Sequence, residues 1–231
     1  MNTQFLAELP QYIARALVLL LCIPVHEFSH AWVSFKLGDP TAKYQGRLTL
    51  NPLKHFDPIG CISMLVLGIG WAKPVPIDPR YYKNPKAGMA VSAAAGPLSN
   101  ILMAFVSLIL YKFCYYAYYT SGGSDFLYYI SLLLVYMVTI NIALGIFNLM
   151  PVPPFDGSRI FGAVLPDRAY WGIMRYERYI FLGVMLLLVL GVLDRPLYLA
   201  QNGLYTALDF LTRPVDYLAA ALFGVPGAVS V

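Results

Sequence analysis

Three long apolar blocks in this sequence limit the folds that are open to it. They lie at about residues 12–35, 87–119 and 126–150, and each has the roughly twenty predominantly apolar residues that cross a bilayer. Only 12% of the 231 residues are charged, whereas a soluble domain usually carries roughly a quarter. Because lipid offers no hydrogen bonds, each span must satisfy its own backbone groups. We therefore predict an all-α bundle of transmembrane helices.

The C-terminal part of the sequence contains shorter or less apolar segments. Residues 158–178 are polar and amphipathic, and residues 179–193 are apolar again. Residues 204–223 are interrupted by three charged side chains, which also fits a helix that lies along the membrane interface. The sequence predicts four to six spans, which together form a single integral-membrane domain over residues 1–231.

Two shorter features separate the first long block from the second. Residues 36–58 are polar and rich in turn residues, with a strand-like stretch at 47–50, which predicts a short β-hairpin-like loop at the membrane surface. Residues 59–71 are apolar but short for a span, and they contain three glycines. A re-entrant segment is the expected structure there.

Positive charges gather in three of the loops. Lys and Arg occur within residues 36–54, 73–86 and 159–178, whereas the loop at 120–125 has none. The positive-inside rule places the three basic loops on the cytoplasmic side of the membrane. This rule also accounts for the formal net charge of +4, so we expect the lipid bilayer and not nucleic acid as a partner.

The first apolar block contains the HExxH pattern His26-Glu27-Phe28-Ser29-His30. Residues four apart share one face of a helix, so both imidazoles can bind one zinc ion while Glu27 takes a proton from water. Burying two histidines and a glutamate in lipid is costly unless they are paired or coordinated. The pattern therefore predicts a metal site inside the membrane.

A catalytic zinc ion generally has three protein ligands, and the residues alone leave more than one candidate for the third. Asp156 follows a proline-broken stretch at the end of a span, where non-helical backbone must face protein or a cavity. Its Pro-Phe-Asp-Gly surroundings suit an ordinary turn equally well. His55 is the leading rival, although a histidine in such a loop is more often an ordinary surface residue. The candidates near the membrane are His55, Asp39, Asp57, Asp78, Asp156 and Glu177.

Small residues mark the second long block. The stretch AAAGPLSN, residues 93–100, supplies side chains that let transmembrane helices approach closely. We interpret Gly96, Pro97 and Asn100 as residues of helix packing and a helix kink.

HEFSH in one span and NLMPVPPFDG at the end of a later one resemble the site-2 protease family, the intramembrane zinc metalloproteases of peptidase family M50. GRLTLNPLKHFDPIG, WAKPVP and AAAGPLSN resemble its compact bacterial-type members, which have no PDZ or CBS domain. The match covers roughly residues 24–157. It implies one zinc ion per chain with the ligands His26, His30 and Asp156. It also implies that Glu27 is the general base and that Asn148 positions the substrate carbonyl.

The resemblance further implies a zinc metalloendopeptidase that cuts membrane-protein or membrane-associated peptide substrates within or near the bilayer, by means of a zinc-activated water. It implies a multi-pass protein of the bacterial inner membrane whose active site faces the cytoplasm. A metal or ion transporter is an alternative, because intramembrane His, Glu and Asp also mark ion pathways. A non-catalytic, zinc-containing membrane scaffold is another, and a membrane zincin with Glu177 as a ligand is a third.

Overall fold

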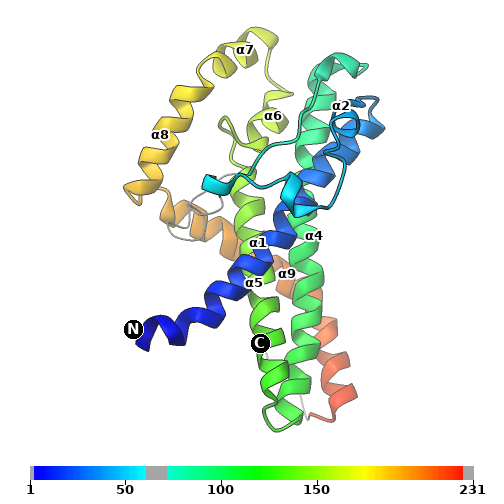
Figure 1. The fold of residues 1–231 in the computed structure, drawn as a ribbon, viewed down its shortest axis with the longest axis vertical. Helices are drawn as coiled ribbons and strands as arrows, with labels where there is room; N and C mark the ends of the chain where they lie inside the picture. The colour runs from blue at the N-terminus through cyan, green and yellow to red at the C-terminus, as the bar shows by residue number, and fades with distance from the viewer. Residues whose placement is uncertain (1–2, 61–71, 226–231) are drawn as a thin grey trace.

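The computed structural model describes residues 3–60 and 72–225, and these residues form helices joined by loops (Figure 1). Three helices are long and apolar enough to cross a membrane: α1 (Thr3–Lys36), α4 (Pro85–Thr120) and α5 (Asp125–Asn148). They coincide with the three long apolar blocks. The predicted all-α bundle of spanning helices is therefore confirmed for the described part of the chain.

A fourth candidate span is broken in the middle. Helices α8 (Glu177–Val189) and α9 (Asp194–Phe223) pass the test of length and hydropathy only as a pair, and they are bent by 87° where they meet. Within the described residues there are thus three spans, or four if this pair is counted as one. The expected range of four to six spans is met only at its lower limit.

The short elements lie at one end of the bundle, together with the C-terminus of α1, the N-terminus of α4 and the C-terminus of α5 (Figure 1). Residues 47–50 form an irregular loop, so the expected hairpin is not confirmed. Residues 61–71, most of the expected re-entrant segment, lie outside the described residues. The short elements are α2 (Thr41–Tyr44), η1 (Pro52–Lys54), η2 (Pro79–Tyr81), α6 (Asp156–Gly162) and α7 (Asp167–Arg175).

Helix α4 is the centre of the bundle, with α5 running alongside it and α1 crossing it (Figure 1). The face that it buries is a stripe of small and polar residues at a spacing of four, so that they share one side of the helix. Leucines on the opposite side are exposed and suit contact with lipid. Close approach through small side chains is how transmembrane helices pack without a hydrophobic driving force. The stripe consists of Gly88, Ser92, Gly96, Asn100 and Ala104.

An extended segment, residues 72–78, crosses the end of the bundle and is called the strap below. Its far end is held by Asp39, whose buried carboxylate accepts hydrogen bonds from the Asp78 amide (2.8 Å), the Ser34 hydroxyl (2.8 Å) and the Thr41 amide (2.9 Å). Burial alone would raise the pKa of Asp39, but these donors outweigh it and lower the pKa below its usual value. Asp39 therefore stays charged and ties the strap to the end of α1.

The near end of the strap is bound to the polar loop. The Lys73 amide donates to the His55 carbonyl (2.9 Å), and the Arg47 guanidinium donates to the Lys73 carbonyl (2.6 Å). His55 is itself fully buried, with Nε2 2.7 Å from the Thr49 carbonyl oxygen. The polar loop and the strap thus form one hydrogen-bonded layer over this end of the bundle.

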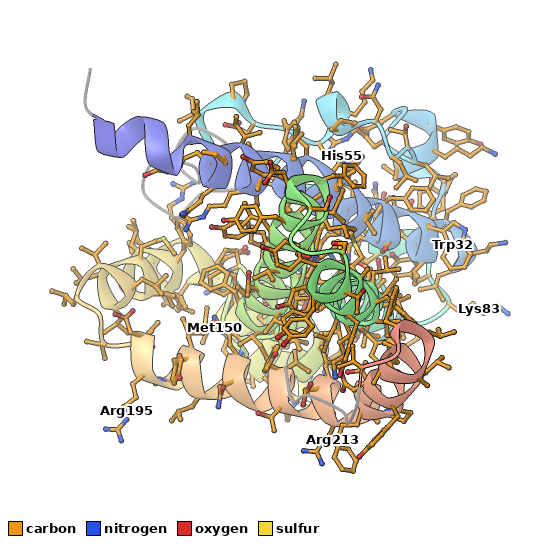
Figure 2. All side chains as sticks on the ribbon, turned by 90° about the horizontal axis from the view of Figure 1, so that it is seen from below. Trp32, His55, Lys83, Met150, Arg195 and Arg213 are labelled. Carbon is orange, nitrogen blue, oxygen red and sulfur yellow. The ribbon has the colours of Figure 1, made fainter. Side chains whose placement is uncertain are left out.

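A buried ion cluster fastens α9 to α4. Lys112 of α4 is 1% exposed, and its ammonium lies 2.8 Å from Asp209 Oδ1 and 2.6 Å from Asp216 Oδ2 of α9. Arg195 and Arg213 extend from the other side of α9, away from the bundle and from Lys112 (Figure 2). Asp209 and Asp216 of α9 therefore face a lysine that is itself almost fully buried. This pairing compensates for the cost of burying its charge.

We expect Lys112→Met to destabilise the protein by about 3–5 kcal/mol, because it leaves two carboxylates facing an apolar helix without a counter-charge. The measurement is thermal or denaturant unfolding of the purified protein in detergent. The exposed Lys83 provides a matched control, because its side chain points away from the molecule (Figure 2) and Lys83→Met should leave the unfolding transition unchanged. Equal transitions for the two variants would contradict a structural role for the cluster.

Candidate metal centre

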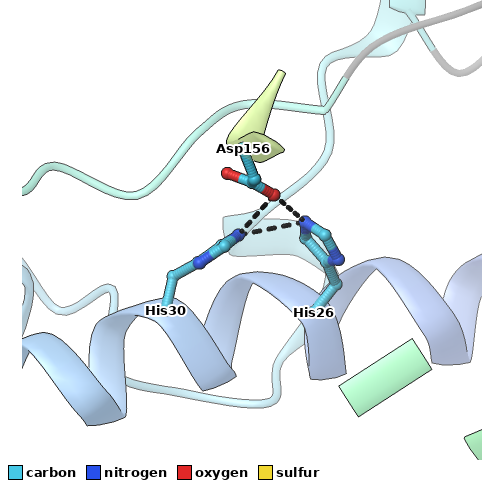
Figure 3. Close-up of side chains that lie close together, drawn as sticks. All are labelled: His26, His30 and Asp156. Atoms are coloured by element: carbon cyan, nitrogen blue, oxygen red, sulfur yellow. Dashed lines mark hydrogen bonds and ion pairs between the residues drawn. The ribbon is translucent and has the colours of Figure 1, made fainter. Parts of the chain in front are cut away.

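Two motifs that are far apart in the sequence meet at one point in the structure. His26 and His30 lie one turn apart on α1 with their Nε2 atoms 3.0 Å from each other. Asp156, the first residue of α6, places Oδ2 3.4 Å from His26 Nε2 and 3.2 Å from His30 Nε2 (Figure 3). Both imidazoles are buried, and the Asp156 side chain is mostly buried. Among the described residues this is the one group of three that could hold a metal ion.

The outer nitrogen of each imidazole faces an oxygen of α4. His26 Nδ1 lies 2.5 Å from Asn100 Oδ1, and His30 Nδ1 lies 2.8 Å from the carbonyl oxygen of Ser92. These oxygens accept hydrogen bonds and cannot donate them, so each Nδ1 carries the proton. Each neutral ring then presents the lone pair of Nε2 to the centre of the group.

The donor set fits a zinc ion. Two imidazole lone pairs and a carboxylate oxygen face one another across about 3 Å, an arrangement that is repulsive without a cation between them. Ligand atoms at the usual ~2.0–2.1 Å from a tetrahedral zinc ion lie about 3.3 Å apart, close to the observed spacing. Asp156 Oδ2 is also a buried atom without a conventional hydrogen bond. We conclude that the cluster has the chemistry and the dimensions of a zinc site.

Gly96 lets α4 come this close to the two histidines. A Cβ atom at this position would lie 2.3 Å from His30 Nε2 and 2.6 Å from His26 Cε1, far inside contact distance. Gly96 lies about 16 Å along α4 from its first residue, roughly a third of the length of this 36-residue spanning helix. The AAAGPLSN stretch therefore serves more than helix packing: Gly96 makes room for the imidazoles and Asn100 contacts one of them.

Glu27 is buried next to the histidines and is held by the strap. Its Oε2 accepts a hydrogen bond from the Val75 amide at 2.9 Å. Pro74 and Pro76 flank this residue and have no N–H group, so Val75 supplies the only backbone donor of this tripeptide. The prolines also favour an extended backbone here, which carries that single donor to the carboxylate.

The other expected residues lie outside the cluster. Asn148, at the end of α5, donates its side-chain amide to the Leu144 carbonyl of its own helix (3.0 Å), and no contact joins it to the three candidate ligands. The rival ligand His55 is occupied in the loop layer described above. Of the remaining candidates, Asp39 is saturated by donors, Asp57 accepts from the Gly60 amide, Asp78 pairs with Arg80 and Glu177 begins α8.

Sequence reasoning assigned no role at this site to Ser92 or Val75, and it assigned Asn100 to helix packing. A signal for the α4 residues was nevertheless present, because Ser92, Gly96 and Asn100 are spaced by four and so share one helix face with a polar character. No sequence spacing of this kind indicated the hydrogen bond between the Val75 amide and Glu27. It depends on where the strap passes relative to α1.

The spanning helices and the buried His-His-Asp group define a membrane metalloprotein of the HExxH type. A model of peptidase family M50 matches residues 122–192, a range that includes Asp156 but not HEFSH. YwhC of Bacillus subtilis (strain 168), named as a zinc metalloprotease, is 38% identical over 179 residues, which are 75% of this chain and 78% of YwhC.

Two further relatives carry zinc metalloprotease names. Rip2 of Mycolicibacterium smegmatis is 29% identical over 76% of this chain and 66% of its own length. MJ0392 of Methanocaldococcus jannaschii is 31% identical over 66% of this chain but only 34% of its own length. No solved structure matches the chain significantly. The chain belongs to peptidase family M50 and is a membrane zinc metalloprotease, which favours proteolysis over the transporter and scaffold alternatives.

Gly96→Ala should abolish metal binding, because the added methyl group would occupy the space of the two imidazoles. Gly145→Ala is the matched control within the bundle, since its Cβ would meet Ile101 and Pro97 at ordinary contact distances of 3.4–3.5 Å. The measurement is the zinc content of each purified variant by elemental analysis. Stoichiometric zinc in a folded Gly96→Ala variant would contradict the close approach of α4.

Proposed function

We propose that this protein is a single-domain intramembrane endopeptidase that hydrolyses peptide bonds of membrane-protein or membrane-associated peptide substrates. The observation that carries the proposal is the convergence of His26, His30 and Asp156 within a bundle of spanning helices, with Glu27 alongside. The substrate must then reach a centre that lies about a third of the way along the spanning helix α4, so a segment that enters the bilayer is the natural substrate.

In this proposal His26, His30 and Asp156 hold one zinc ion per chain. When bound, zinc supplies Lewis acidity to the hydrolysis of the scissile amide. Glu27 is the general base: its carboxylate accepts a proton from the attacking water and returns it to the leaving nitrogen. The Val75 amide, bound to Oε2, orients the carboxylate for this transfer and leaves Oε1 to carry the proton. The resemblance also assigns Asn148 to the substrate carbonyl; one N–H of its side-chain amide is bound to the Leu144 carbonyl, and the second N–H is the donor for that contact.

We further propose that the loop-bearing end of the bundle faces the cytoplasm of a bacterial cell, across its inner membrane. The three basic loops join helix ends that lie at this end of the molecule (Figure 1), and the Lys83 side chain points away from the rest of the protein (Figure 2). The turn between α4 and α5, at the opposite end, has no Lys or Arg. This asymmetry supports a cytoplasmic position for the polar loop and the strap.

Glu27→Gln should keep its zinc but lose proteolysis by about 10²–10⁴-fold, because the amide cannot accept the proton. Asp156→Ala should lose both zinc and activity. The experiment incubates each purified variant in detergent with a panel of single-span membrane proteins and determines bound zinc in the same samples. Glu177→Gln, at a partly exposed carboxylate of α8, and Asp167→Ala, at an exposed carboxylate of α7, are controls away from the cluster and should behave as wild type. Cleavage by Glu27→Gln at the wild-type rate would refute the assignment of the base.

Val75→Pro should lower kcat by about 10- to 100-fold while zinc content stays unchanged, because it deletes the one N–H that orients Glu27. Val75→Ala keeps that N–H and should retain most activity, which separates the loss of the hydrogen bond from the loss of the side chain. The measurement is steady-state cleavage of a substrate found in the panel. Equal kcat for the two variants would show that the strap does not position the base.

A further inference from the structure

Two asparagines form a buried chain of hydrogen bonds behind the metal centre. Asn100 of α4 and Asn141 of α5 are both fully buried, although each lies on a membrane-spanning helix. Asn100 Nδ2 donates to Asn141 Oδ1 at 2.8 Å, while Asn100 Oδ1 faces His26 Nδ1 at 2.5 Å. Asn141 Nδ2 donates to the Met137 carbonyl at 2.7 Å and to the Cys22 sulfur at 2.9 Å. The chain thus links α5 to α4 and ends on an imidazole of α1.

The direction of this chain is set at its far end. The Met137 carbonyl can only accept a hydrogen bond, so the group of Asn141 that faces it must be the NH₂ group. Asn141 then presents its side-chain oxygen to Asn100, so Asn100 must donate a hydrogen bond from its own NH₂ group. The oxygen of Asn100 is therefore the atom that remains for His26. Because this oxygen accepts, His26 Nδ1 must donate, and the lone pair of His26 Nε2 points to the metal centre.

The two histidines differ in the kind of group that accepts the hydrogen bond from Nδ1: a backbone carbonyl for His30 and a side-chain amide for His26. The partner of His30 Nδ1 is the backbone carbonyl of Ser92, which stays in place as long as α4 is helical. The partner of His26 is an amide that could rotate by 180° and offer N–H groups in place of oxygen. Asn141 prevents this rotation by supplying an acceptor on one side only. The arrangement favours one tautomer of one ligand.

We propose that Asn100 and Asn141 are positioning residues of the metal centre, which hold His26 in the tautomer that binds zinc through Nε2. This inference rests on the proposed function only in taking His26 as a ligand. Two buried amides in the membrane-spanning part of a bundle are costly to maintain for packing alone, because small apolar residues pack there without the desolvation of polar groups. Partners of this kind behind a metal-bound histidine typically contribute 10- to 100-fold in metal affinity.

The test measures the zinc dissociation constant of full-length protein in detergent by competition with a chelating indicator, and the absorption spectrum of the Co²⁺ form. We expect Asn100→Leu to weaken zinc binding by about 10- to 100-fold and to change the Co²⁺ spectrum. Asn100→Asp should recover most of the loss, because a carboxylate also accepts from His26 Nδ1. Asn202→Leu, the same change at an exposed asparagine of α9, should bind as wild type.

Asn141→Leu separates positioning from a local packing defect. This residue contacts no metal ligand directly, so its effect on zinc should pass through Asn100. We expect a weaker loss than for Asn100→Leu, and the double variant should bind no worse than Asn100→Leu alone. Wild-type affinity and an unchanged Co²⁺ spectrum in folded Asn100→Leu would overturn the proposal, as would fully additive losses in the double variant.

A measurement on the wild-type chain covers the case in which the variants fail to fold. The sequence has only three histidines, so ¹⁵N-labelled histidine gives a simple solid-state NMR spectrum of the zinc-loaded protein. We expect two rings bound through Nε2 with protonated Nδ1. Coordination of His26 through Nδ1 would overturn the inference. Unchanged zinc affinity in His26→Ala would instead reject the ligand set of the proposed function. If the protein cleaved no substrate in the panel, these zinc-binding results would still stand.

Discussion

The mutual repulsion of three acceptor atoms in a membrane-embedded space is the constraint on which the rest of this structure depends. Two imidazole lone pairs and a carboxylate oxygen lie about 3 Å apart in a largely buried space between α1, α4 and α6. Such a group is stable only around a cation, and the surrounding residues are arranged to keep it in that form. Each Nδ1 faces an oxygen, Gly96 leaves the space for both rings, and the strap holds the neighbouring Glu27.

One stripe of α4 serves both packing and chemistry. Small residues on this face let α1 and α5 approach closely, and at the level of the metal centre the same face provides the Ser92 carbonyl and the Asn100 amide. The two roles are compatible because residues spaced by four stay on one side of the helix. A wholly apolar stripe would pack the helices but would leave His26 Nδ1 without its side-chain acceptor, and a bulkier residue in place of Gly96 would fill the space of the imidazoles.

Polar networks away from the centre have a different task. Asp39 and the polar loop fix the two ends of the strap, so that a chain segment without regular secondary structure still carries the Val75 amide to a defined place. Lys112, with Asp209 and Asp216, attaches α9 to the bundle in a region where apolar packing alone has no hydrophobic advantage over lipid. Charges in this protein are therefore buried where they determine position.

The sequence by itself determined the spans of α1, α4 and α5 to within a few residues at most boundaries, and the common face of His26 and His30. These depend on local properties, namely hydropathy over a helix length and the 3.6-residue period. From local pattern alone, Asp156 and His55 both suited an ordinary loop, although the family resemblance favoured Asp156. Only the tertiary structure placed Asp156, and not His55, beside the two histidines. It alone showed the contacts of Asn100 and Val75 and the irregular course of residues 47–50. The physical reason is that these contacts join segments tens of residues apart, and their distances follow from how whole helices and the strap pack, which no local pattern encodes.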